Sequence, residues 1–331
     1  MIPEEKQPAV ERALQAAFGV NEYEAIHLLT GGLSSALAFK IVVKNDPYLL
    51  KILRKELISD PTHEFACQQT AAEAGIAPRI WYASVEDRLL ISDFVDTKPF
   101  PDDMARLIAP TLRRLHSLPD FPRPVMGSYF EAANGFVRRF QAAKILPESA
   151  TAELFRRYAE LVMVYPRNDS ELVASHNDLK PQNIRFDGKH IWLVDWESAF
   201  LNDRYVDLAI AANFFVKDEA QEEDYLRAYF GEPGGEYRRA RFFLVRQILS
   251  MFYAALLLLE ASRSGLSINA DMTTPDFKEF HQDLIADKVD MANAEAKLLY
   301  GMIHLREARR AMRTRRFEEA VARVGDIHAG L

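Results

Sequence analysis

Cysteine is almost absent from this 331-residue chain, since Cys67 is the only one. An intrachain disulfide is therefore impossible, which suits a reducing compartment, and we expect a cytoplasmic location. The first residues, Met1 to Lys6, have neither the basic start nor the apolar core of a secretory signal. The longest apolar runs, Leu208–Val216 and Phe252–Leu259, are shorter than the roughly 20 residues of a membrane span, so we expect buried helices and no span.

An excess of basic residues is also lacking, because the formal net charge is -7. This balance argues against a general nucleic-acid partner. Internal repeats and low-complexity segments are absent, and the hydrophobic content of 49% with 27% charged residues is ordinary for a globular protein. The length allows one large domain or two modest ones, each with a substantial core, and the oligomeric state stays open.

What the chain does contain is an ordered set of polar residues suited to phosphoryl transfer from ATP. That chemistry needs a carboxylate to accept the acceptor's proton and two oxygen ligands for Mg²⁺. The pattern His-x-Asp-x-x-x-x-Asn supplies Asp178 and Asn183. Strand-like residues 184–186 and 191–194 flank an Asp-Gly turn and predict a hairpin. A hairpin would bring Asn183 back beside Asp195, where the two could share a metal ion.

Each piece alone has a simpler explanation, such as a capped helix start or a solvated strand end. The ordered combination, however, resembles the choline/ethanolamine kinase and aminoglycoside phosphotransferase superfamily. The His-Asn-Asp-Leu sequence at 176–179 is closer to the choline kinase branch, because aminoglycoside enzymes more often have Gly where Asn177 stands. Asn202-Asp203, followed by Val206 to Ala209, also resembles that branch. The resemblance covers about residues 29–259.

This resemblance implies an α+β, protein-kinase-like fold with two lobes. A nucleotide-binding lobe with a small antiparallel sheet and a helix would occupy residues 1–92, a connection 93–98, and a mainly α-helical lobe 99–331. The expected strands are 23–29, 36–43, 48–53, 80–84 and 89–92, and the main expected helices are 8–18, 62–74, 207–215, 239–262, 275–312 and 316–324.

On the nucleotide side, the resemblance assigns the loop around Gly31, Gly32 and Ser34 to the phosphates, since small residues let backbone N–H groups approach them. Lys51 on the third strand would contact phosphate. A Glu on the next helix would hold Lys51, with Glu64 preferred over its rival Glu73. Backbone groups of the connection at Asp93 and Val95 would pair with adenine.

In the helical lobe, Asp178 is the expected base, or at least the residue that positions the acceptor hydroxyl, and His176 braces its loop. Asn183 and Asp195 would hold Mg²⁺. Asp207 either hydrogen-bonds the backbone of the catalytic loop or serves as an ordinary helix cap. The activation segment that protein kinases place after the metal-binding Asp is missing, which favours a small-molecule acceptor.

The acceptor is less well defined. An amine would favour carboxylates, with Glu197 and Asp203 as candidates, and a choline-like cation would favour aromatic faces. The aromatic candidates are Trp196, Tyr205, Phe214, Phe252 and Tyr253.

The sequence is compatible with three functions. They are a choline- or ethanolamine-type kinase, an antibiotic or sugar kinase of the aminoglycoside type, and an inactive nucleotide-binding scaffold. Retention of every polar group needed for transfer weighs against the scaffold. The stretch Leu305–Arg323, with seven Arg and three Glu, predicts a solvated basic helix or a docking surface for a partner or for the chain's own acidic body.

Overall fold

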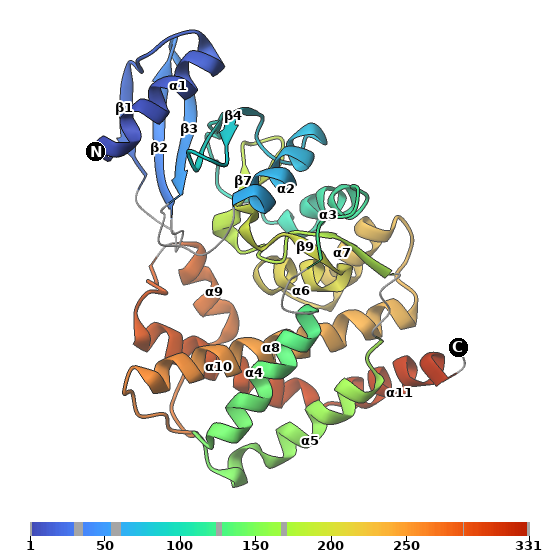
Figure 1. Cartoon of the computed structure of the whole chain (residues 1–331). Helices are drawn as coiled ribbons and strands as arrows, with labels where there is room; N and C mark the ends of the chain where they lie inside the picture. The colour runs from blue at the N-terminus through green and yellow to red at the C-terminus, as the bar shows by residue number, and fades with distance from the viewer. Residues whose placement is uncertain are drawn as a thin grey trace.

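The computed structural model describes residues 2–29, 36–53, 61–123, 128–166, 171–286 and 288–329. A small sheet lies at one end of the molecule and a larger helical body at the other (Figure 1). The strands are β1 (Ala25–Leu28), β2 (Ala36–Val43), β3 (Asp46–Leu53), β4 (Ile80–Ser84), β5 (Leu89–Asp93), β6 (Leu172–Ser175), β7 (Ile184–Phe186), β8 (Ile191–Leu193) and β9 (Phe200–Asp203). The α-helices are α1 (Gln7–Phe18), α2 (Pro61–Glu73), α3 (Met104–Leu115), α4 (Tyr129–Ala143), α5 (Glu148–Val164), α6 (Arg204–Phe215), α7 (Glu219–Phe230), α8 (Glu236–Arg263), α9 (Phe277–Ile285), α10 (Ala294–Met312) and α11 (Arg315–Ala329).

The small sheet is antiparallel throughout, with strand order β1-β2-β3-β5-β4. Alternate residues of β3 point to opposite faces, as a strand requires. Leu50 and Ile52 are buried in one core with Val10 and Leu14 of α1. Lys51 lies between them in sequence, so its side chain leaves from the opposite face. The alternation of apolar residues in β3 therefore places Lys51 on the side of the sheet away from α1.

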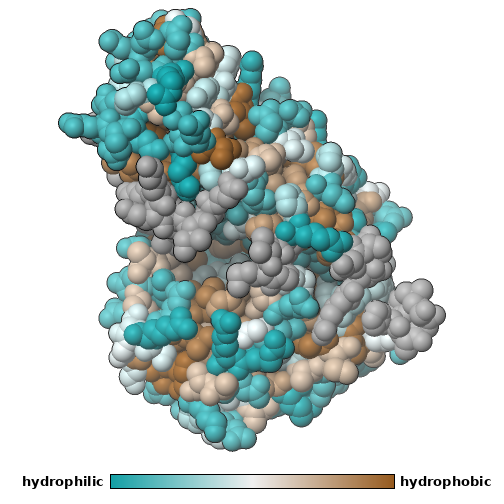
Figure 2. All heavy atoms as spheres, in the orientation of Figure 1, coloured by the Kyte–Doolittle hydropathy of each residue, from teal (hydrophilic) through white to brown (hydrophobic). Residues whose placement is uncertain are grey.

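Helix α8 is the central element of the helical body. It packs against α4, α6, α10 and α11. Within the described residues it is the one helix that is long and apolar enough to cross a membrane, and 72% of its most apolar stretch is buried inside the protein. A core helix surrounded by other helices shows the same combination of composition and burial. The visible surface carries hydrophobic atoms only in separate patches among hydrophilic ones (Figure 2).

The prediction of a single helix over residues 275–312 is wrong. Helix α9 ends at Ile285, and α10 begins only at Ala294. The side chain of Asn293 accepts a hydrogen bond from the Glu295 N–H at 2.7 Å, which caps a new helix start. A side-chain oxygen at this position satisfies one of the free N–H groups of the first turn. The cap makes a separate start at Ala294 favourable.

The basic C-terminal helices dock on the chain's own acidic residues. Arg313 of α10 pairs with Glu153 of α5, and Arg316 of α11 pairs with the buried Glu222 of α7. Arg309 also donates to the Ala150 carbonyl at 2.8 Å. Of the explanations that the sequence left open for this arginine-rich stretch, docking against the chain itself is the one that the structure shows.

Two helical glycines, Gly301 in α10 and Gly135 in α4 as its control, test how closely α10 packs on α8. A Cβ on Gly301 would lie 2.9 Å from Leu258 Cγ and 3.2 Å from Leu257 Cβ. We expect Gly301→Ala to lower the free energy of unfolding, since overpacking costs about 1–3 kcal/mol. Gly135 in α4 has nothing within 4 Å of such a Cβ. Gly135→Ala should therefore raise stability by about 0.5–1 kcal/mol through helix propensity. Urea unfolding of both variants measures this, and equal changes would contradict the packing account.

Candidate active site

The loop between β6 and β7 gathers polar side chains around Asp178. The Asp178 carboxylate oxygen Oδ2 accepts hydrogen bonds from Lys180 Nζ at 2.6 Å and from Asn183 Nδ2 at 2.8 Å. The same Asn183 nitrogen also donates to the Asp178 carbonyl at 2.9 Å. Because the amide nitrogen of Asn183 is directed at Asp178, its oxygen is the atom that remains for a cation.

The hairpin predicted from the sequence is present, with Ile184 opposite Leu193 and Phe186 opposite Ile191. One step beyond the strands, the Val194 N–H donates to the Asn183 carbonyl at 3.0 Å. Asp195 follows immediately and has a left-handed backbone, with φ 69°. Non-glycine residues are uncommon in this region, and such strain often marks functional sites. The chain therefore returns Asp195 to the neighbourhood of Asn183.

Lys51 links the small sheet to this site. Its Nζ lies 2.6 Å from Glu64 Oε1 and 2.7 Å from Asp195 Oδ1. Burial alone would lower the pKa of Lys51, but the two carboxylates raise it above its ordinary value. Burial likewise opposes ionisation of Asp195, yet Lys51 holds the pKa of Asp195 below its usual value. Of the two helix carboxylates considered, Glu64 is the partner, because the exposed Glu73 accepts from Gln69 on its own helix.

The side chains around Asp195 supply only part of the oxygen ligands that a magnesium ion needs. Within the described part of the chain, no group of three or more His, Cys, Asp or Glu side chains is arranged to hold a metal. Asp195 and Asn183 offer one carboxylate and one amide oxygen. Mg²⁺ is usually held by one or two carboxylates together with substrate phosphates and water. The residues present therefore fit Mg²⁺ that arrives with a phosphate ligand.

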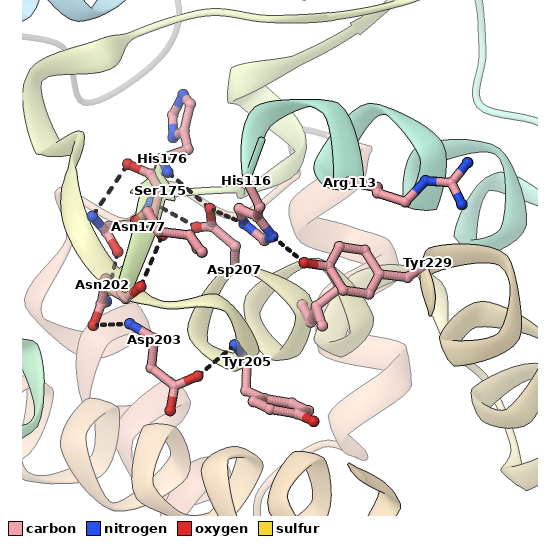
Figure 3. Close-up of polar contacts among 12 residues, drawn as sticks. Arg113, His116, Ser175, His176, Asn177, Asn202, Asp203, Tyr205, Asp207 and Tyr229 are labelled. Carbon is pink, nitrogen blue, oxygen red and sulfur yellow. Dashed lines mark hydrogen bonds and ion pairs between the residues drawn. The ribbon is translucent and has the colours of Figure 1, made fainter. Parts of the chain in front are cut away.

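A buried carboxylate from α6 fixes the start of the catalytic loop (Figure 3). Asp207 Oδ2 accepts the His176 N–H at 2.8 Å, and Oδ1 accepts the Asn177 N–H at 2.7 Å. Asn177 is left-handed, with φ 65°. The Asn177 side chain donates to the Ser198 carbonyl at 2.9 Å and accepts from Asn202 at 2.7 Å. The contact that the sequence suggested for Asp207 is thus present, and it holds the residue before Asp178.

The imidazole of His176 is wholly buried and bridges two parts of the site. Its Nε2 lies 3.0 Å from the Val194 carbonyl oxygen, so Nε2 carries the proton and donates. Its ring also packs on Trp196, with 4.8 Å between ring centroids. His176 therefore joins the catalytic loop to the residue before Asp195. This geometry suits a residue that holds the catalytic loop in place.

The connection between the two parts of the molecule borders an open pocket of about 500 Å³, whose lining includes Asp93, Phe94 and Val95. The Asp93 carboxylate accepts a hydrogen bond from Trp81 Nε1 at 2.7 Å, and the Asp93 N–H donates to the Arg79 carbonyl at 2.9 Å, so the pairing of Asp93 with adenine stays a prediction. Gly31, Gly32 and Ser34, which the sequence assigned to the phosphates, lie outside the described residues.

Three of the four principal acceptor candidates have other partners. Trp196 has no exposed surface. Asp203 accepts from Arg241 at 2.8 Å and from the Tyr165 hydroxyl at 2.7 Å. Tyr205 is 4% exposed and lies under the same guanidinium, 4.7 Å from its ring centroid. Trp196 and Tyr205 thus have almost no surface to offer an acceptor, whereas Asp203 is ion-paired but still lines a cavity with Tyr129, so its contact with an acceptor stays a prediction.

The fourth candidate, Glu197, lies on the metal side of the site. Burial raises its pKa, and the charge of Asp195 raises it further, whereas Lys51 and Lys180 oppose this shift. Glu197 is therefore an exposed carboxylate in the neighbourhood of the Lys51 ion pair, and its contact with an acceptor stays a prediction.

Four half-buried aromatic side chains, which we call the aromatic wall, are Tyr129, Phe136, Phe252 and Tyr253. Two of them, Tyr129 and Tyr253, lie close enough to Asp178 for its charge to raise their pKa beyond the effect of burial. Phe252 contacts the other three, with ring centroids 5.3–5.5 Å apart. Tyr129 and Tyr253 share a hydrogen bond. Burial raises the pKa of Tyr253, and the charge of Asp178 raises it further.

Sequence reasoning proposed Phe252 and Tyr253 but missed Tyr129, Phe136 and the cation Lys180. The Ser-x-x-Glu pattern at Ser128 and Glu131 could have identified the start of α4, because these residues form a capping box. It could not have shown that the helix comes close to Asp178. Lys180 lies inside the His-x-Asp-x-x-x-x-Asn motif, but the motif itself assigns no role to this position.

Comparison with known proteins agrees with this geometry. A model of the phosphotransferase enzyme family matches residues 25–243. A search of curated protein sequences found no match.

Several solved structures have the same fold. A choline/ethanolamine kinase family protein from Mesorhizobium loti is 18% identical, with a TM-score of 0.68 over 97% of this chain and 99% of that chain. A choline kinase from Streptococcus pneumoniae is 15% identical, with a TM-score of 0.56 over 86% and 98%. A spectinomycin phosphotransferase in complex with ADP and spectinomycin is 13% identical, with a TM-score of 0.55 over 89% and 98%. These likenesses confirm the predicted two-lobe, protein-kinase-like α+β fold, and the first extends over the C-terminal helices. The lobe boundaries at residues 92 and 98 stay predictions.

Proposed function

The chain belongs to the phosphotransferase enzyme family, and from this premise we propose that it transfers the γ-phosphate of ATP to a hydroxyl group of a small, positively charged acceptor. The acceptor that we favour is an amino alcohol of the choline or ethanolamine type. A cytoplasmic location remains part of the proposal, since ATP is available there.

The observation that carries the proposal is the convergence of four side chains from three segments of the chain. Lys51 of β3 pairs with Asp195, and Asn183 hydrogen-bonds Asp178. The hydrogen bond between Val194 and Asn183 joins the two pairs. Phosphoryl transfer depends mainly on such positioning and on neutralising charge. A scaffold protein without activity would have no need for this set.

Each residue then has a role. Asp178 would accept the proton of the acceptor hydroxyl while that oxygen forms a bond to the γ-phosphorus. The bond from the γ-phosphorus to the β–γ bridging oxygen breaks, and its electron pair leaves with ADP. Lys51 would contact phosphate oxygens, and Asn183 and Asp195 would hold Mg²⁺. When bound, the metal ion would supply positive charge to the phosphates.

The aromatic wall supports a cationic acceptor, because aromatic faces attract ammonium groups. Tyr129 and Tyr253 of this wall lie near Asp178, where the acceptor's hydroxyl must be. The names of the choline kinase and of the choline/ethanolamine kinase family protein are in line with this class. The similar fold of the spectinomycin phosphotransferase keeps an antibiotic acceptor as the second candidate.

Two isosteric substitutions separate the roles of the two aspartates. We expect Asp178→Asn to leave the affinity for Mg-ATP nearly unchanged and to slow turnover about 10²–10⁴-fold, the usual effect of removing a general base. Asp195→Asn should weaken the Mg²⁺-dependent part of ATP binding. Calorimetry with ATP, with and without Mg²⁺, and coupled turnover assays measure both. Wild-type binding and turnover in the Asp195 variant would mean that the metal ligand has been misassigned.

The class of the acceptor is tested by a panel measured with coupled ATP turnover. It contains choline, ethanolamine, kanamycin, glycerol and dimethylbutanol, the uncharged carbon isostere of choline. If the aromatic wall recognises a cation, choline should have a KM about tenfold below that of the isostere, since a desolvated cation–π contact contributes about 1–2 kcal/mol. Turnover of kanamycin alone would favour the antibiotic class. Efficient turnover of only the neutral alcohols would contradict both cationic classes.

A further inference from the structure

A line of buried hydrogen bonds leads from Asp207 away from the catalytic loop to α7 (Figure 3). Asp207 Oδ2 lies 3.1 Å from His116 Nε2, and His116 Nδ1 lies 2.6 Å from the Tyr229 hydroxyl. All three side chains are buried. None of them reaches the aromatic wall or Lys51 through a hydrogen bond described in the structure. The line therefore acts on the catalytic loop from behind.

The carboxylate of Asp207 fixes the direction of the protons in this line. Both of its oxygens receive backbone N–H groups, and a carboxylate can only accept. His116 Nε2–H therefore donates to Asp207. Nδ1 of the neutral imidazole is then an acceptor, and the Tyr229 hydroxyl donates its proton to it. Burial raises the pKa of Tyr229 to about 12, so it keeps this proton at neutral pH.

We propose that Tyr229 is a positioning residue for phosphoryl transfer: its hydroxyl holds the His116 ring in the orientation in which Nε2–H donates to Asp207, and Asp207 holds the backbone in front of Asp178. The inference rests on the proposed function, because it concerns the rate of that reaction. It gives α7, a helix that contributes no side chain to the described site, a part in catalysis.

The physical reason lies in the left-handed backbone of Asn177 (φ 65°). Such a conformation is unfavourable for a non-glycine residue and persists only where its surroundings enforce it. Removing the Tyr229 hydroxyl leaves His116 Nδ1 buried without its donor. The proton stays on Nε2, where the Asp207 carboxylate accepts it, but the imidazole ring has lost the contact on its other side that holds its orientation. The clamp on residues 176 and 177 would loosen, and Asp178 would move.

The experiment compares two Tyr→Phe substitutions on one helix. Tyr225 is 1% exposed, and its hydroxyl donates to the Leu208 carbonyl at 3.1 Å, so Tyr225→Phe loses one buried hydrogen bond without touching His116. We expect Tyr229→Phe to lower kcat about 10- to 100-fold, as a misplacement near 1 Å can do. The KM for ATP should stay within about twofold, because Lys51 and Asp195 are untouched, and Tyr225→Phe should keep the wild-type kcat. Melting temperatures of both variants control for folding.

A second readout does not depend on activity. In protein labelled with ¹⁵N-histidine, the His116 resonances should show a proton on Nε2 and none on Nδ1. The Nδ1 signal should shift toward that of an unbonded imidazole nitrogen in Tyr229→Phe and stay unchanged in Tyr225→Phe, with His116→Gln providing the assignment. Equal kcat in the two Tyr variants, or an unchanged Nδ1 signal in Tyr229→Phe, would overturn the inference. If the wild-type protein transfers no phosphate but the Nδ1 signal responds as described, the proposed function fails and the hydrogen-bonded line stands.

Discussion

The hold of one buried carboxylate on two backbone N–H groups is the interaction on which the site depends. Asp207 has no exposed surface and receives His176 N–H, Asn177 N–H and the His116 ring. A carboxylate is costly to bury unless donors surround it, so this arrangement stabilises one loop geometry strongly. With the backbone fixed at Asn177, the direction in which Asp178 leaves the loop is fixed as well.

A second constraint joins the sheet to the helical body. Lys51 belongs to β3, and its two carboxylate partners come from α2 and from the segment after β8. The two ion pairs therefore help to hold these three elements together. Removing one partner of such a buried set leaves an uncompensated charge, which is far more costly than losing an exposed pair. The same contacts that would organise a nucleotide site thus also set how the two parts of the molecule meet.

The sequence predicted those features that local spacing controls. An Asp-Gly turn between two apolar runs predicts a hairpin, and the hairpin brings Asn183 and Asp195 together wherever it lies. The sequence also assigned Lys51 to the third strand, and the strand is there. Alternation of side chains along that strand then explains why Lys51 points away from the core formed with α1.

Features that depend on tertiary packing could not be read in this way. Asp203 and Tyr205 follow the catalytic motif closely and looked available, yet Arg241, nearly forty positions later in the chain, occupies both. Glu64 and Glu73 share one helix, and only the angle at which α2 docks decides which of them meets Lys51. The break between α9 and α10 depends on the N-cap at Asn293. Such a cap stabilises a new helix start by only about 1 kcal/mol, which is too little to predict from the sequence against one continuous helix.

The central claim is that this site moves a phosphate group from ATP to a hydroxyl compound. The most direct test is a ³¹P NMR time course of the purified protein with ATP, Mg²⁺ and the acceptor panel. The account predicts that the γ-phosphate signal of ATP decays while ADP and a new phosphomonoester signal grow in equal amounts. ATP that stays intact with every acceptor, or that yields only inorganic phosphate, would contradict it.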